Sequence, residues 1–217
     1  MYTWKGFVKA LRPGILTVLA VLILGGCGKG PGPAPVSVED LVTQGWQWFE
    51  TGQLDSAYAA FGEAVSRNAT YPEAWLGMGW VSLRLYDPVY AHQSFLRTLS
   101  LGGDSLDAWA GLAIADADPL PDPTLYGMPI DSVLTLALQA GQAVLDREPA
   151  YRFAHDARVD ATLLQLEQAR VLCSLGRFDE ALAIVQRLDP DFQADVHTPE
   201  GRAALLTRIA ELLGGSG

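Results

Sequence analysis

Apolar and small side chains recur at a fixed spacing along the middle of the chain, with polar positions between them. The spacing is 34 residues, and inside each repeat the apolar residues stand three and four apart, as on one face of an α-helix. A repeat of this length holds two helices and a turn, and a single hairpin cannot bury its apolar face alone. The pattern therefore predicts a stack of helical hairpins. The matching residues are Trp46 and Trp80, Ala57 and Ala91, Phe61 and Phe95, and Trp75 and Trp109.

Four hairpin units are expected, and the third is interrupted. Its first helix begins near Asp107, but proline in the stretch 118–129 removes backbone donors and clashes with the preceding turn. This stretch is predicted to be an inserted loop, after which the second helix runs from about Asp131 to Arg147. A last amphipathic helix would cap the open end of the stack. The predicted units lie near 38–71, 72–105, 106–150 and 151–190, within a helical domain at 37–217, and the capping helix lies at 199–213.

The order of large and small residues within a unit resembles the tetratricopeptide repeat (TPR) family. That family has a large residue at the fourth position, small residues at the eighth and twentieth, and an aromatic residue at the twenty-fourth. The resemblance implies an all-α, right-handed solenoid of helical hairpins. The family usually has glycine and proline late in the unit. Gly52 fits this pattern in unit one, but Tyr86 stands at that place in unit two and departs from it. The matching positions are Leu41 and Trp75, Gly45 and Gly79, Ala57 and Ala91, and Phe61 and Phe95.

The tryptophans divide into two groups by their positions in the repeat. Small residues such as Gly45 let the two helices of a hairpin approach each other, and large side chains fill the space around the crossing. Trp48, Trp75 and Trp109 fall on family positions that pack inside or between hairpins, so they are predicted to be core residues.

A second apolar stripe runs beside the predicted core stripe on the first helices of the units. The resemblance places it on the concave face, where TPR proteins bind their partners, and such an exposed apolar patch is typical of an interaction site. The alternative is that the protein covers the stripe itself, with the loop Pro119–Pro129 or with the C-terminal helix. The predicted partner-binding residues are Val42, Trp46, Phe49, Leu76, Trp80, Leu83 and Ile114, with Ala117 continuing the stripe.

The N-terminal 26 residues are typical of a bacterial signal peptide. Lys5, Lys9 and Arg12 precede an apolar run at 15–24, which is too short to cross a membrane because a spanning helix needs roughly 20 apolar residues. The run ends in Leu24-Gly25-Gly26-Cys27, which resembles the lipobox of bacterial lipoproteins. The resemblance implies cleavage before Cys27 and its lipidation, although an ordinary secretory signal or an uncleaved anchor is the alternative.

The residues after Cys27 are predicted to form a tether. The segment 27–36 is rich in glycine and proline, has no apolar periodicity and favours an extended chain. Because Gly28 rather than aspartate follows the cysteine, the lipoprotein resemblance implies the outer membrane, facing the periplasm, in a double-membrane bacterium. In a single-membrane organism it implies the outer face of the cell membrane.

Charge and cysteine content narrow the choice of partners. The chain has 25 acidic and 15 basic residues, and three of the basic ones lie in the predicted leader. Nucleic acid is excluded as a partner, because binding phosphates needs clustered lysine and arginine. Cys173 would have no disulfide partner if Cys27 carries lipid, and its apolar neighbours predict a buried thiol.

Catalytic patterns are missing from the sequence. His92, His155 and His197 stand far apart and form no metal-binding or nucleophile-activating motif, so no cofactor, metal site or catalytic residue is expected. The acidic residues of the insert are predicted to form a solvated loop. The expected function is a non-catalytic interaction scaffold or adaptor of the cell envelope. Alternatives are an assembly factor for outer-membrane or secretion complexes, and an enzyme or enzyme subunit that uses Asp116, Asp118 and Asp122.

Overall fold

The computed structural model describes residues 36–102 and 105–214. The predicted signal peptide, Cys27 and most of the tether lie outside these described residues. Within them the regular secondary structure is entirely helical, apart from an isolated bridge between Arg152 and Asp160. The predicted fold class is therefore confirmed.

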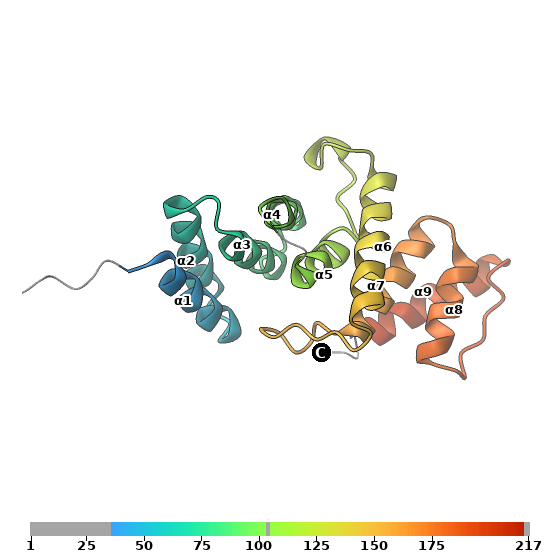
Figure 1. The fold of residues 1–217 in the computed structure, drawn as a ribbon. Coiled ribbons are helices and arrows are strands. Elements are labelled where there is room, and N and C mark those ends of the chain that lie inside the picture. The colour runs from blue at the N-terminus through green and yellow to red at the C-terminus, as the bar shows by residue number, and fades with distance from the viewer. Residues whose placement is uncertain (1–35, 103–104, 215–217) are drawn as a thin grey trace, which may run out of the picture. The chain divides into compact units, whose positions relative to one another are not determined.

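The helices follow one another in pairs (Figure 1). Their ends carry the chemistry that helices need: Ser37 and Asp40 form a reciprocal capping box, and the Asp87 side chain accepts a hydrogen bond from the Tyr90 amide before Pro88 opens the next helix. The helices are α1 (Val38–Glu50), α2 (Leu54–Arg67), α3 (Pro72–Arg84), α4 (Pro88–Ser100), α5 (Leu106–Ala115), α6 (Ile130–Arg147), α7 (Ala161–Ser174), α8 (Phe178–Leu188) and α9 (Pro199–Gly214), with a short 3-10 turn at Pro123–Leu125.

The first three hairpins pack on one another through an aromatic ring seated against glycine, Phe61 in the first and Phe95 in the second. Phe61 of α2 is fully buried, and a β-carbon at Gly45 of α1 would lie only 2.7 Å from its Cε1 atom. A β-carbon at Gly77 of α3 would collide with the same ring. Phe61 thus fills the space between the first hairpin and the second, which is why small residues recur at these positions.

The odd-numbered helices form one face of the stack. α1 contacts α3, α3 contacts α5, and α5 contacts α7, while each also packs against its own hairpin partner. At the end of the stack, Leu205 and Ile209 of α9 are buried in a cluster with Cys173 of α7 and Val185 of α8. The C-terminal helix therefore covers the last hairpin, as a capping helix does.

The insert between α5 and α6 packs against α4. Tyr126 is buried and its ring lies edge-on to His92 of α4, 5.3 Å between centroids. The Tyr126 hydroxyl accepts a hydrogen bond of 3.0 Å from the Leu120 amide.

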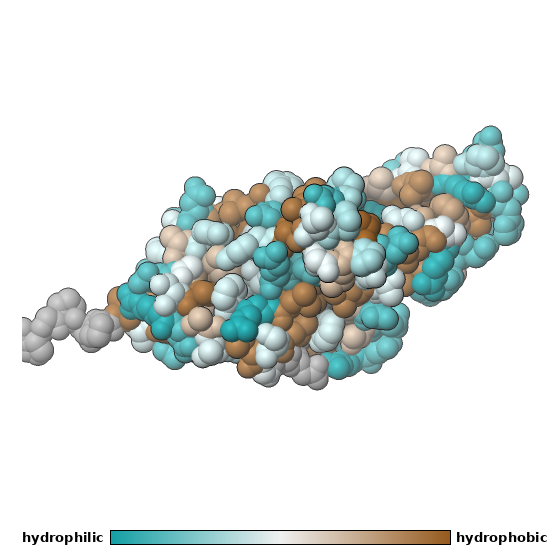
Figure 2. Space-filling model, turned by 90° about the horizontal axis from the view of Figure 1, so that it is seen from above, coloured by the Kyte–Doolittle hydropathy of each residue, from teal (hydrophilic) through white to brown (hydrophobic). Residues whose placement is uncertain are grey.

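On the face that Figure 2 shows, apolar patches are broken up by polar side chains, so no single broad apolar area stands out there.

One acidic residue of this region corrects the prediction of a solvated loop. Asp116 is fully buried, and its carboxylate oxygens lie 2.8 and 2.9 Å from Nδ1 of the buried His92. Burial raises the pKa of Asp116, because the charged form is disfavoured away from water. Asp118 and Asp122 are exposed, as expected. The prediction failed at Asp116 because the residue closes helix α5 and faces α4.

The two groups of tryptophans are also arranged differently from the prediction. Trp48, Trp75 and Trp109 are only half-buried, although Trp48 and Trp109 pack against the core, whereas Trp46 and Trp80 are 8% and 2% exposed. The Trp75 indole donates a hydrogen bond of 2.9 Å to the Ala69 carbonyl at the surface of the α2–α3 turn. The residues predicted to face an open groove are thus the more deeply buried ones, which requires something to lie over them.

Candidate partner-binding site

The predicted stripe does assemble on the face of the odd-numbered helices. α1 contributes Val42, Trp46 and Phe49, α3 contributes Leu76, Trp80 and Leu83, and α5 contributes Ile114. All are buried except Leu83 and Ile114, which are half-buried. Ala117 leaves the stripe and packs with Leu134, Ala137 and Val171 instead, because the chain turns into the insert at this point.

Residues 151–160, here called the cover, lie over the stripe. This segment joins α6 to α7 and extends toward α1 and α2 (Figure 1). Phe153 stacks on Trp80 with 4.1 Å between ring centroids and meets Trp46 edge-on at 5.9 Å. His155 stacks flat on Trp46 at 3.9 Å. The stripe is therefore covered by the protein itself.

Polar contacts at several points hold the cover on the helices. The Tyr151 hydroxyl donates to Asp107 at 2.6 Å, and His155 Nδ1 lies 2.7 Å from a Glu50 carboxylate oxygen. Burial, together with the neighbouring Asp107 charge, raises the pKa of Tyr151, so this phenol remains a neutral donor. Within the cover, the Phe153 amide donates to the Val159 carbonyl at 2.9 Å. The cover is thus an ordered part of the fold.

The covering segment corrects the alternatives drawn from the sequence. Neither the loop Pro119–Pro129 nor the C-terminal helix is the segment that stacks on Trp46. The sequence does carry a weak signal at the right place, because Tyr151, Phe153 and His155 alternate with polar or small residues. That alternation is too short to distinguish from an ordinary turn. Whether the buried stripe residues ever contact a partner remains a prediction.

An open cavity of about 370 Å³ remains at the edge of the cover. Its wall is formed by α3, α5 and α7, by the α3–α4 turn, by the cover and by the end of α9. Leu83 and Ile114, the two half-buried residues of the stripe, line it together with Trp80. The lining residues are Trp80, Leu83, Arg84, Tyr86, Ile114, Asp156, Arg158, Val159, Leu163 and Leu213.

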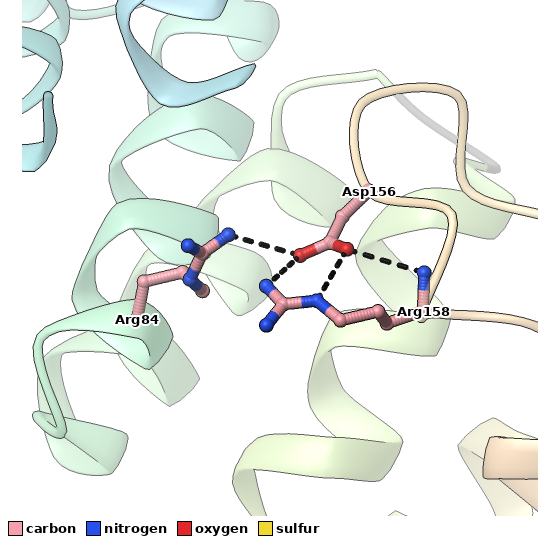
Figure 3. Close-up of polar contacts among 3 residues, drawn as sticks. All are labelled: Arg84, Asp156 and Arg158. Atoms are coloured by element: carbon pink, nitrogen blue, oxygen red, sulfur yellow. Dashed lines mark hydrogen bonds and ion pairs between the residues drawn. The ribbon is translucent and has the colours of Figure 1, made fainter. Parts of the chain in front are cut away.

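Three charged residues stand at this cavity (Figure 3). Figure 3 shows the Asp156 carboxylate between two guanidinium groups; it accepts a bond of 3.0 Å from Arg84 Nη1, and bonds of 2.7 and 2.9 Å from Arg158 Nη2 and Nε. The bonds from Arg158 lower the pKa of Asp156, although partial burial opposes them. Two positive groups share one negative group, so the cavity carries a local positive charge on an acidic protein.

The residues considered for catalysis do not converge. Asp116 pairs with His92, Asp118 forms an ion pair with Arg170 at 3.1 Å, and Asp122 accepts hydrogen bonds from Thr124. Each carboxylate thus has a separate partner. Among the described residues, no group of three or more His, Cys, Asp or Glu side chains is arranged to hold a metal ion. None of the helices in the described part of the chain is both long and apolar enough to span a bilayer.

Known proteins resemble this chain mainly in fold. No family model matches it. Cellulose synthase operon protein C of Komagataeibacter sucrofermentans is 27% identical over 190 residues, which span 76% of this chain but only 14% of that protein. Among solved structures, YrrB, described as a TPR protein with an unusual peptide-binding site, matches with a TM-score of 0.55 and 18% identity, over 81% of this chain and 86% of its own.

Two further structures agree with this result. A thermophilic TPR protein of Thermus thermophilus has a TM-score of 0.50 and 20% identity, covering 83% of this chain and 84% of its own. MamA has a TM-score of 0.52 and 17% identity, covering 70% and 71%. The fold is that of a TPR solenoid. At these identities the likeness concerns the fold alone.

The TPR solenoid accounts for part of the site but not all of it. Its repeat brings Trp80, Leu83 and Ile114 to one face, as the 34-residue period predicts. Sequence reasoning missed Arg84 and Arg158, because neither belongs to an apolar pattern. The bond from Arg84 to Asp156 joins residues 72 positions apart, and such a contact leaves no periodic signal. These residues could be found only from the fold.

Proposed function

We propose that this protein is a non-catalytic, membrane-anchored interaction scaffold of the bacterial cell envelope that binds a segment of another protein. The observation that carries the proposal is the open cavity of about 370 Å³, in which three of the predicted partner-binding residues come together on the face of the odd-numbered helices. A concave, mainly apolar site with a few polar groups at its rim is the usual form of a binding pocket.

Anchoring is proposed through lipid on Cys27. The support is the sequence Leu24-Gly25-Gly26-Cys27 and the glycine- and proline-rich residues that follow it. The proposed location is the outer membrane, facing the periplasm, in a double-membrane bacterium, and otherwise the outer face of the cell membrane. In either place a tether at 27–36 would hold the helical domain away from the bilayer.

The comparisons give this proposal limited support. YrrB is described as a TPR protein with a peptide-binding site, which is consistent with peptide binding on the same fold here. A narrower role, as an assembly factor for outer-membrane or secretion complexes, draws no direct support from the comparisons, because the 27% identical relative is named only for a cellulose synthase operon. Because this chain spans a small part of that relative, the narrower role is a secondary proposal.

Site-directed photocrosslinking in native membranes tests the proposed function. A photoreactive amino acid replaces Leu83, which lines the cavity, and in a control chain it replaces Leu206, which is 47% exposed on α9 and lies outside the cavity. We expect a discrete protein adduct from position 83 that is missing from position 206. No adduct at position 83, or the same adducts at both positions, would contradict partner binding at this cavity.

A further inference from the structure

Three hairpin turns of the solenoid share one backbone geometry. In each, the residue after the helix C-cap adopts a left-handed conformation: Gly52 with φ 76°, Gly176 with φ 75° and Tyr86 with φ 61°. The hydrogen bonds also match. The Tyr86 amide donates to the Leu83 carbonyl at 3.1 Å and the next amide donates to the Ser82 carbonyl at 2.9 Å, which is the Schellman arrangement.

Tyrosine is an unfavourable residue for this position. A left-handed backbone brings the β-carbon close to the following carbonyl oxygen, so glycine is preferred there and a bulky side chain is strained. The side chain gains almost nothing in return from the fold, because Tyr86 is 94% exposed. The glycines at the two equivalent turns show that the hairpin itself does not require an aromatic ring.

Tyr86 lies where an exposed aromatic ring has a use. It lines the open cavity together with Trp80 and Leu83, next to Arg84 and Arg158. The side chains of these arginines are 33% and 55% exposed, so both guanidinium groups are accessible from solvent while they bind Asp156. The site therefore offers an apolar cavity, a positive charge and an unpacked phenol side by side.

Each of these groups selects a feature of the partner. The apolar wall accepts an aliphatic or aromatic side chain, and guanidinium groups bind carboxylates with charge-assisted hydrogen bonds. Tyrosine and arginine are enriched among residues that dominate binding energy at interfaces. Backbone strain at an exposed position is characteristic of functional sites, where it is retained despite its cost to stability.

We propose that Tyr86 is a recognition residue and that the partner is an acidic peptide segment. One apolar side chain of this segment enters the cavity, an adjacent carboxylate binds Arg84 and Arg158, and Tyr86 packs against the segment at the rim. This inference rests on the proposed function and adds the chemistry of the partner to it.

Three fluorescein-labelled octapeptides serve as probes of the full chain. The first has one phenylalanine flanked by aspartates, the second has lysines in place of the aspartates, and the third has alanine in place of the phenylalanine. Fluorescence anisotropy at low ionic strength measures binding. We expect saturable binding of the first peptide and weaker binding of the other two, by about tenfold or more. The proposed chemistry would be overturned if the acidic and basic peptides bound equally well. It would also be overturned if none of the three peptides bound.

The variant Tyr86→Gly separates recognition from folding, because the two effects have opposite signs. Removing the strained side chain should raise the thermal midpoint by a few degrees. It should weaken binding of the acidic peptide by about tenfold or more. The matched control is Gly52→Tyr, which creates the same strain in the first hairpin, away from the cavity. It should lower the thermal midpoint and leave peptide binding unchanged.

Two results would refute a recognition role for Tyr86. One is a Tyr86→Gly chain that binds the acidic peptide as tightly as the wild type. The other is a Tyr86→Gly chain with a lower thermal midpoint, since the tyrosine would then be structural. If the acidic peptide does not bind while position 83 still crosslinks to a partner, only this inference is wrong. If both experiments fail, the proposed function is wrong as well.

Discussion

At the scale of single residues, the contact between Phe61 and Gly77 shows how closely the first two hairpins pack. A methyl group at Gly77 would overlap the buried ring, and the ring is already enclosed by the first hairpin. Gly77→Ala should therefore lower the free energy of unfolding by about 1–3 kcal/mol, the usual cost of overpacking a core. Urea denaturation followed by circular dichroism measures this change.

Gly62→Ala is the matched control for that substitution. Gly62 lies in α2, and a β-carbon there would have no heavy atom within 4 Å. Alanine is the better helix former, so the control should gain about 0.5–1 kcal/mol of stability. If Gly77→Ala were as stable as Gly62→Ala, the close packing of the hairpins around Phe61 would be refuted.

Cys173 is predicted to be an unreactive thiol in the folded protein. It is buried, as the sequence suggests, and burial raises its pKa from 9.0 to about 11. The folded protein thus favours the neutral thiol more than the unfolded chain does. This contribution to folding stability is fully present below about pH 9 and is lost as the pH rises through about 11. Iodoacetamide at about pH 8 should therefore label Cys173 in urea and leave it unlabelled without urea.

The background for that labelling experiment is Cys27→Ser, which leaves Cys173 as the only thiol of the chain. Fast labelling of the native protein would mean that α7 opens readily or that the thiol is accessible. Either result would contradict the buried position.

At the scale of elements, the sequence predicts helices well because their signals are local. The apolar spacing, the capping residues Ser37 and Asp87 and the prolines of the insert all act within a few residues of the helix ends that they set. The cover is different. His155 meets Glu50 across 105 residues of sequence, and no periodic pattern encodes such a contact. This is why the sequence alone does not decide between an open groove and self-coverage at Trp46, and why it does not identify residues 151–160 as the covering segment.

The attachment of the cover should weaken in acid. Bonds from Arg158 and the charge of Arg84 hold the pKa of Asp156 below its ordinary value of 3.8. A lowered pKa in the folded state means that the charged Asp156 carboxylate stabilises the fold above about pH 4. This stabilisation is lost as the pH falls through the folded pKa. Backbone amides of residues 151–160 should therefore exchange faster below pH 3.8, after correction for the intrinsic rate, as mass spectrometry measures.

Asp156→Asn should produce the same faster exchange at neutral pH. The control is Asp122→Asn, since Asp122 also has a lowered pKa, from hydrogen bonds with Thr124, but lies on the insert. The control should leave exchange of residues 151–160 unchanged. Equal protection in both variants would show that the ion pairs do not hold the cover in place.

At the scale of the whole molecule, the proposed anchor can be tested directly. Cys27→Ser removes the proposed acceptor for lipid, so the variant should carry no acyl mass and should keep the uncleaved N-terminal segment. Mass spectrometry of the intact protein from the membrane fraction checks this. A wild-type mature chain that starts at another residue, or that has no acyl group, would contradict lipid anchoring.

The candidate site was predictable only in part for reasons that also belong to this scale. A repeat places equivalent residues on one face, so Trp80, Leu83 and Ile114 follow from the period. Arg84 and Arg158 meet because a connecting segment folds back over earlier units. Such a contact departs from the neighbour-to-neighbour rule of solenoids and therefore lies beyond repeat analysis.

The cover also sets an order of events during synthesis. The contact between His155 and Glu50 joins residues 105 positions apart. A ribosome that adds about 5–20 residues per second needs about 5–20 s to synthesise this stretch of chain. During this interval the first two hairpins can pair their helices, but Trp46 and Trp80 have no Phe153 or His155 over them. A nascent chain of this protein thus presents two bare tryptophans to chaperones until residue 155 arrives.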